Sequence, residues 1–196
     1  MSSDIETLKV YGDMADDYAA LANEIADPAL TTFIGALPKG SHVLDLGCGP
    51  GFAAGHMARA GLTVDATDAA PAMVELAGKQ DGVNAWVATF DDLTGSSLYD
   101  GIWANFSLLH APRGDMPRYL GTLRELIKTG GMFHIGMKTG TGEHRDALGR
   151  LYTYYTEEEL TVLLNDARFT PFSSTTGRDK GLDGEWADWV TITAHA

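Results

Sequence analysis

The chain has 196 residues, with 14 basic and 27 acidic side chains and a formal net charge of −13. This length suits one domain of about 100–200 residues. A composition of 44% hydrophobic and 21% charged residues is typical of a folded protein rather than a disordered one. The acidic balance argues against binding to bare nucleic acid or to an anionic membrane surface, because both need clustered Lys and Arg.

Cysteine and histidine usage narrows the chemistry further. The single cysteine, Cys48, excludes an internal disulfide and a cysteine-based zinc site, and the six histidines show no ligand spacing, so we expect no metal. No apolar run approaches the roughly 18–20 residues of a membrane span, and the acidic N-terminus does not resemble a signal peptide. We therefore expect a cytoplasmic monomer or homodimer.

Short apolar runs alternate with amphipathic stretches along the chain, which is typical of an α/β domain. Helices are predicted at residues 13–26, 29–37, 52–60, 71–79, 115–128 and 156–167. Strands are predicted at residues 41–46, 62–67, 83–88, 101–105, 132–138, 170–176 and 186–194, and loops at 140–151 and 177–184. Helices between strands give right-handed crossovers and parallel pairing, whereas the last two strands can pair antiparallel because no helix separates them.

A glycine-rich turn follows the first predicted strand. Gly47, Gly49 and Gly51 alternate there, and a predicted helix begins directly afterwards. Glycine lets the backbone turn tightly and approach a ligand, and the start of a helix offers free N–H groups. This arrangement predicts a site for a nucleotide-like cofactor.

The residues around the turn leave two cofactors to compare. Gly49, Gly51 and Ala54 loosely match the dinucleotide fingerprint, so a nicotinamide-dependent oxidoreductase is one interpretation. Asp45 argues against it, because a carboxylate beside the turn repels a pyrophosphate but suits an ammonium group. S-adenosylmethionine carries an α-amino group and a sulfonium, and has no phosphate.

Residues 45–51, which read Asp-Leu-Gly-Cys-Gly-Pro-Gly, resemble motif I of the class I S-adenosylmethionine-dependent methyltransferases. The resemblance extends from Tyr11 to about Trp189. It implies a three-layer, Rossmann-like α/β fold with a seven-stranded, mostly parallel sheet whose last strand is antiparallel. It also implies S-adenosylmethionine as cofactor and S-adenosylhomocysteine as product. The matching residues that would cradle the methionine and ribose parts are Asp45, Gly47, Cys48, Gly49 and Gly51.

The same resemblance divides a single domain, residues 1–196, into three parts. Residues 1–37 are expected to form N-terminal lid helices, and residues 41–138 the cofactor-binding core. Residues 139–196 are expected to supply a substrate-side loop and the closing strands. In the lid, a hydroxyl of Tyr11 or Tyr18 could close over the cofactor, although ordinary core packing explains both residues equally well.

Asp68 ends the second predicted strand, where a carboxylate can accept hydrogen bonds from both ribose hydroxyls. The alternative, Asp65, lies inside the strand rather than at its carboxyl end, where ligands bind in such sheets. Ala69 and Met73 follow, and Met73 could pack against the adenine face.

The third strand departs from the family pattern. Many members carry an acid just after this strand for the adenine amino group, but Thr89 occupies that position here. The adenine contact is therefore assigned to Thr89 and Phe90, with Asp91 as a close neighbour. Alternatively, Asp91 and Asp92 form a solvated turn.

The segment after the fourth strand is expected to face the reactive methyl group. Asn105, Phe106 and Ser107 stand at the carboxyl end of that strand, and His110 starts the next turn. His110 is a candidate general base, because the unperturbed pKa of histidine lies near neutrality. The alternative is a packing residue at a helix start.

Four cations are predicted near the substrate-side edge of this acidic protein. Arg113, Lys138 and Arg150, together with Arg145, could recognise an anionic small molecule. The alternative is that they are scattered, solvated charges.

The predicted function is methyl transfer to a small-molecule acceptor by in-line displacement. Residues 105–108 lack the Asn/Asp-Pro-Pro-aromatic segment of enzymes that methylate exocyclic amines of bases. Methylation of a base carbon by the covalent route needs a cysteine nucleophile, and the only cysteine lies in the glycine turn. A protein side chain or a metalloid oxyanion are weaker acceptor hypotheses. Two other functions stay open: a nicotinamide-dependent oxidoreductase, and a non-catalytic methyltransferase-fold binding subunit.

Overall fold

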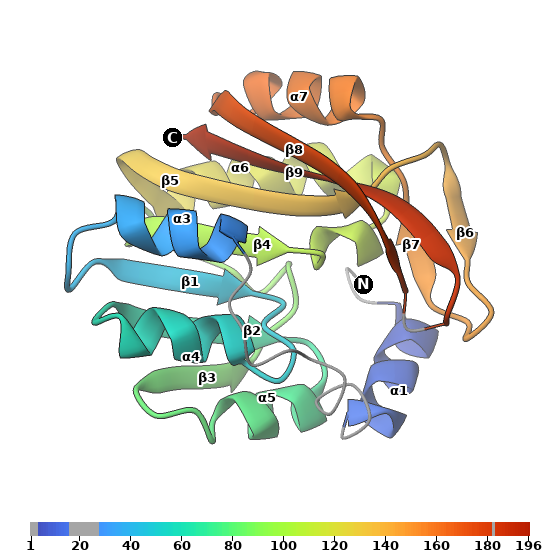
Figure 1. Cartoon of the computed structure of the whole chain (residues 1–196), viewed down its shortest axis with the longest axis horizontal. Coiled ribbons are helices and arrows are strands. Elements are labelled where there is room, and N and C mark those ends of the chain that lie inside the picture. The colour runs from blue at the N-terminus through green and yellow to red at the C-terminus, as the bar shows by residue number, and fades with distance from the viewer. Residues whose placement is uncertain (1–3, 16–27, 182) are drawn as a thin grey trace.

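The computed structural model describes residues 4–15, 28–181 and 183–196 (Figure 1). Its main feature is a seven-stranded sheet in the order β3-β2-β1-β4-β5-β9-β8. The strands are β1 (His42–Leu46), β2 (Thr63–Asp68), β3 (Val83–Val87), β4 (Tyr99–Asn105), β5 (Ile127–Lys138), β8 (Thr170–Lys180) and β9 (Trp186–His195). Strands β1 to β5 pair in parallel, and β9 pairs antiparallel with both β5 and β8. The predicted α/β fold with an antiparallel last strand is confirmed.

Helices cover both faces of the sheet (Figure 1). The α-helices are α1 (Ile5–Asp13), α3 (Pro28–Ala36), α4 (Phe52–Arg59), α5 (Pro71–Ala77), α6 (Met116–Leu126) and α7 (Glu157–Asp166). Two short 3-10 helices, η1 (Leu108–His110) and η2 (Arg113–Asp115), connect β4 to α6. Helices α3, α4 and α5 lie on one face and α6 and α7 on the other, whereas α1 stands beside the carboxyl ends of the strands (Figure 1).

The alternation of side chains along the strands explains the two cores. Successive residues of a strand point to opposite faces. In β1, Val43 packs into the core with α3 and α4, and Leu44 packs into the core with α6 and α7. In β4, Trp103 packs into the core with α3 and α4, and Ile102 packs into the core with α6 and α7. Asp45 therefore points to the α3–α4 face, where the first core approaches the carboxyl edge of the sheet.

Helix boundaries show where sequence patterns are informative. The predicted helix at residues 156–167 is confirmed as α7, and a capping box of Thr156 and Glu159 marks its start. The N-terminal helix, however, begins at Ile5 rather than at residue 13, because the Asp4 side chain caps it by accepting from the Thr7 backbone N–H. Most of the predicted helix 13–26 lies outside the described residues.

The substrate-side segment is more ordered than its polar sequence predicts. Residues 140–151 were expected to be a loop, but they include β6 (Glu143–Arg145), which pairs antiparallel with β7 (Leu151–Thr153). Strand β8 also continues to Lys180, four residues past the predicted end at 176, because it pairs with β9 as far as Trp186. Backbone pairing with a partner strand stabilises segments whose side chains carry no apolar alternation.

No helix among the described segments is long and apolar enough to cross a bilayer. Within the same segments, no group of three or more His, Cys, Asp or Glu side chains is arranged to hold a metal ion.

Candidate functional site

A cavity of about 420 Å³ opens at the carboxyl ends of β1, β2 and β4 and reaches helix α1. This volume is within the range of small-molecule and cofactor pockets. The sequence-predicted residues that line it are Tyr11, Asp45, Gly47, Cys48, Gly49, Asp68, Ala69, Met73, Thr89, Phe90, Asn105, Phe106, Ser107 and His110. Gly51 and Asp91 do not line the cavity, and Tyr18 lies outside the described residues.

The glycine turn forms one wall of the cavity with its backbone. Gly47 and Gly51 have φ angles of 69° and 81°, a conformation that disfavours side chains. A Cβ at Gly47 would lie 2.3 Å from Ser107 Cβ, and one at Gly51 would lie 2.7 Å from Ala77 Cα. The glycines therefore allow both the turn and the close approach of β4 and α5 to it.

Asp45 is buried at the base of the turn. The Ala54 backbone N–H donates to its carboxylate, but its Oδ2 has no hydrogen-bond partner among the described residues. Burial raises the pKa of Asp45 to about 7, with a further contribution from the charge of Asp68. A buried oxygen without a partner is costly, so Asp45 is prepared to accept a donor from a ligand.

Asp68 connects the end of β2 to the glycine turn. Its Oδ2 accepts from the Gly49 backbone N–H at 3.0 Å, and its Oδ1 from the Ala70 backbone N–H at 2.8 Å. Burial raises the pKa of this carboxyl against the effect of these bonds. Each oxygen keeps a lone pair for a further donor, so Asp68 can accept from two ligand hydroxyls.

The part of the cavity wall that follows β3 is formed by Ala88, Thr89 and Phe90. The Thr89 backbone N–H and hydroxyl both donate to Asp92, at 2.8 and 2.7 Å. Asp91 instead pairs with Arg118 of α6, at 2.6 Å. Thr89 and Phe90 therefore face the cavity, while Asp91 points to the surface.

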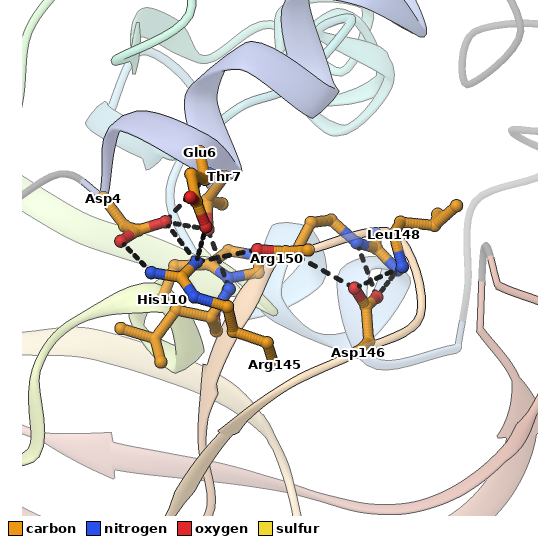
Figure 2. Close-up of polar contacts among 10 residues, drawn as sticks. Asp4, Glu6, Thr7, His110, Arg145, Asp146, Leu148 and Arg150 are labelled. Carbon is orange, nitrogen blue, oxygen red and sulfur yellow. Dashed lines mark hydrogen bonds and ion pairs between the residues drawn. The ribbon is translucent and has the colours of Figure 1, made fainter.

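Opposite the glycine turn, Tyr11 of α1 meets His110 of η1 (Figure 2 shows His110 among its neighbours). The Tyr11 hydroxyl lies 2.8 Å from His110 Nε2, and His110 Nδ1 lies 2.6 Å from the Leu151 carbonyl oxygen. Since a carbonyl only accepts, Nδ1 carries the hydrogen and Nε2 accepts from Tyr11. Burial lowers the pKa of His110 to about 4, which keeps the ring neutral.

Polar contacts hold helix α1 against the β6–β7 hairpin (Figure 2). Arg145 of β6 pairs with Asp4 at 2.8 Å and with Glu6 at 3.1 Å. The Leu151 backbone N–H donates to the Thr7 hydroxyl at 2.8 Å. These contacts place Tyr11 over the cavity.

None of the four predicted substrate cations, Arg113, Lys138, Arg145 and Arg150, is among the cavity-lining residues. Arg150 is buried and binds Asp146 through Nε and Nη2, with Nη1 donating to the Tyr11 hydroxyl at 3.3 Å. Arg113 pairs with Glu159. Lys138 instead lies over the Tyr152 ring, with Nζ 4.0 Å from its centroid. Direct contact of these cations with a ligand in this cavity therefore stays untested.

The sequence patterns missed several lining residues. They are Asp4, Thr7, Leu8, Leu30, Leu46, Pro50, Phe52, Ala53, His56, Ala88 and Trp103. The capping pair of Asp4 and Thr7 was the available signal for α1. Leu30 and Trp103 are core residues whose edges reach the cavity, and nothing in the sequence distinguishes them from the rest of the core.

Comparison with known proteins agrees with this geometry. A family model described as a methyltransferase domain matches residues 43–131. A Burkholderia thailandensis structure, 1,6-didemethyltoxoflavin-N1-methyltransferase with bound 1,6-didemethyltoxoflavin and S-adenosylhomocysteine, aligns at a TM-score of 0.78 and 27% identity, over 96% of this chain and 84% of that one. Residues 43–131 of this chain therefore match a methyltransferase domain, and the fold is that of the class I S-adenosylmethionine-dependent methyltransferases.

More distant structures share the fold. Haemonchus contortus phosphoethanolamine N-methyltransferase 2, in complex with S-adenosyl-L-methionine, aligns at a TM-score of 0.72 and 14% identity, over 95% of this chain and 57% of that one. The cyclase SpnF aligns at a TM-score of 0.72 and 15% identity, over 95% of this chain and 92% of that one. No curated protein sequence matches significantly. The fold is thus shared by proteins with different named activities.

The Burkholderia and Haemonchus structures hold S-adenosylhomocysteine and S-adenosyl-L-methionine, and the residues that line the cavity of this chain fit such a cofactor. Two buried oxygens without partners among the described residues, Asp45 Oδ2 and Ser107 Oγ, belong to cavity-lining residues on the two sides of Gly47. Side chains at Gly47 or Gly51 would collide with neighbouring elements, so only a glycine turn leaves this cradle intact. An ammonium group suits Asp45, and ribose hydroxyls suit Asp68.

Proposed function

We propose that the protein transfers the methyl group of S-adenosylmethionine to a small-molecule acceptor by in-line displacement. The observation that carries this proposal is the pairing of Tyr11 and His110 across the cavity from the glycine turn. When bound, S-adenosylmethionine supplies a methyl group that its sulfonium has already activated. The protein then needs to align the acceptor, exclude water and hold a proton.

Asp45, the glycine turn and Asp68 are proposed to hold the cofactor, with Thr89 and Phe90 at its adenine. Asn105, Phe106 and Ser107, which line the same cavity, are proposed to face the reactive methyl group. The relative with 27% identity is named for the methylation of a small molecule, which supports this class of acceptor.

Tyr11 and His110 are proposed to take the acceptor's proton. The Tyr11 hydroxyl donates to His110 Nε2 and receives a hydrogen bond from Arg150. A proton that reaches the Tyr11 oxygen can therefore displace the hydroxyl proton onto Nε2, which is unprotonated at neutral pH. Because burial lowers the pKa of His110 to about 4, the ring holds this proton only transiently before it is released to solvent. His110 Nδ1–H stays bonded to the Leu151 carbonyl, which fixes the ring during this transfer.

The test is incubation with methyl-labelled S-adenosylmethionine and a panel of small acceptors, with product detected by mass. We expect a product that carries one labelled methyl group. Asp68→Ala should weaken S-adenosylhomocysteine binding by about 1.5–3 kcal/mol in calorimetry, the range for hydrogen bonds to charged groups. Asp166→Ala is the matched control, because Asp166 is exposed at the end of α7, outside the cavity lining, and its removal should leave cofactor affinity within twofold.

The outcomes separate the alternatives. Binding of NAD without binding of S-adenosylhomocysteine would indicate an oxidoreductase. Binding of S-adenosylhomocysteine with no labelled product across the panel would favour a non-catalytic binding subunit.

A further inference from the structure

Phe106, one of the cavity-lining residues, forms the first part of an aromatic rim on the β5–β9–β8 side of the sheet. Phe106 lines the cavity, is 37% exposed and has a φ of 55°. Its backbone N–H donates to the Gly136 carbonyl at 3.0 Å, and a Cβ at Gly136 would lie 2.2 Å from Asn105 Oδ1. A left-handed conformation at a bulky residue is unfavourable, so neighbouring contacts such as this hydrogen bond must hold the Phe106 backbone in place.

Trp189 of β9 forms the second part of the rim. Its ring lies 6.3 Å from the Phe106 ring, centroid to centroid, at an interplanar angle of 82°. A Cβ at Gly177, the cross-strand partner of Trp189, would lie 2.2 Å from Cζ2 of the indole. The indole therefore lies over the backbone of β8, and its Nε1–H donates to Asp179 at 2.7 Å. One side of the indole is packed, and the residue as a whole is half-buried.

Lys138 places a positive charge beside these rings. It is the partner of Trp189 on β5, so the two side chains project from the same face of the sheet. The three arginines predicted with it are paired: Arg113 with Glu159, Arg145 with Asp4, and Arg150 with Asp146. Among the described residues, no carboxylate lies within ion-pair distance of Lys138 Nζ, although Asp183 and Asp146 act on it at longer range.

Tyr152 connects this ammonium group to the proposed proton-accepting pair. The Lys138 ammonium lies 4.0 Å from the Tyr152 ring centroid, and the His110 ring lies 4.7 Å from the same ring. Burial lowers the pKa of Lys138, which reflects weaker hydration of its charge. A poorly hydrated cation gains more from an anionic ligand than a fully solvated one does.

We infer that the acceptor is a planar aromatic molecule carrying an anionic oxygen, with its ring against Phe106 and Trp189 and its anionic group at Lys138. This inference rests on the proposed function, since it names the substrate class of the same site. Aromatic rings pack favourably in stacked or edge-to-face arrangements, and a single well-placed charge then fixes the orientation.

The experiment uses the full chain saturated with S-adenosylhomocysteine and three probes in calorimetry. Naphthalene-2-carboxylate is planar and anionic, its amide is planar and neutral, and cyclohexanecarboxylate is anionic without an aromatic ring. We expect the naphthoate to bind at least tenfold more tightly than either of the others. Lys138→Met should remove the preference for the naphthoate over its amide, and Trp189→Leu should weaken both planar probes at least fivefold.

Phe172→Ala is the matched control. Phe172 is an exposed aromatic residue on β8 that stacks on His195, away from the cavity lining, and its removal should leave all three affinities unchanged. Unchanged naphthoate affinity in both Lys138→Met and Trp189→Leu would overturn the inference, as would equal affinity for the three probes. Either result with normal S-adenosylhomocysteine binding leaves the proposed function standing, whereas loss of cofactor binding in the unmodified chain contradicts both.

Discussion

The two sides of the cavity are built in different ways. On the cofactor side, the Asp68 carboxylate bonds to the Gly49 and Ala70 backbones, 19 and 2 residues away in sequence. On the acceptor side, Tyr11 meets His110 across 99 residues and Thr7 meets Leu151 across 144. Local backbone geometry makes the first side, whereas the second exists only once distant elements have packed. The difference explains why one fold can keep its cofactor site while its acceptor site varies.

The substitution that we expect to disrupt the cofactor side most is the replacement of a turn glycine by alanine. Gly47→Ala places Cβ 2.3 Å from Ser107 Cβ at a φ of 69°, so strain and collision coincide. We expect the free energy of unfolding to fall by about 2–4 kcal/mol and S-adenosylhomocysteine binding to be lost in calorimetry.

Gly40→Ala is the control for that change. Gly40 has a φ of 81°, but a Cβ there has no heavy atom within 4 Å. Only the conformational cost of about 1–2 kcal/mol should remain, with cofactor affinity intact. Equal effects of the two variants would show that the approach of Ser107 to Gly47 is unimportant.

The acceptor side is tested by removing one oxygen. Tyr11→Phe deletes the hydroxyl that bonds to His110 and Arg150 while keeping the ring. We expect kcat to fall by about 100-fold, the lower range for lost proton transfer, with S-adenosylhomocysteine affinity changed by less than threefold. Steady-state kinetics with the acceptor from the panel checks this prediction. An unchanged kcat would restrict Tyr11 to the role of a lid.

On the cofactor side, we expect the affinity for S-adenosylhomocysteine to depend on pH through Asp45. Its raised pKa of about 7 means that the free protein holds a proton there at pH 6, and an ammonium ligand must displace it. Affinity for S-adenosylhomocysteine should therefore rise by up to about tenfold per pH unit below 7 and level off above 8. Calorimetry in buffers of different ionisation enthalpy measures the released proton.

Asp45→Asn has no such proton to release, so its affinity should be weaker and independent of pH across this range. A pH dependence that survives in Asp45→Asn would assign the proton to another group.

The smallest effect is expected at the contact between α1 and the hairpin. Arg145→Ala removes ion pairs in which the Arg145 side chain is 40% exposed, so the stability of the fold should change little. Because these pairs hold α1 over the cavity, we expect a modest rise in acceptor KM that shrinks as salt increases. Lys128→Ala, which breaks an exposed pair with Asp100 remote from α1, is the matched control. A KM that rises equally in both variants would contradict this link.

The sequence predicts the cofactor side better than the acceptor side for the same physical reason. The strand–glycine–helix pattern around Gly47 and the acid at the end of β2 are contiguous signals, and the structure brings Asp45 and Asp68 to one cavity. Arg150 reads as a surface cation in sequence, but folding buries it against Asp146. Residues 143–145 gain strand structure only by pairing with β7, and no local pattern encodes that partner.

The docking of α1 has a practical consequence for making the protein. Asp4 lines the cavity and is bound to Arg145, so a tag fused ahead of it would start close to the cavity. Ala196, by contrast, hydrogen-bonds to Gly130 and Gly131 at the amino-terminal half of β5, at the opposite edge of the sheet. Affinity tags and surface-immobilisation handles therefore belong at the C-terminus, where they are remote from the cavity.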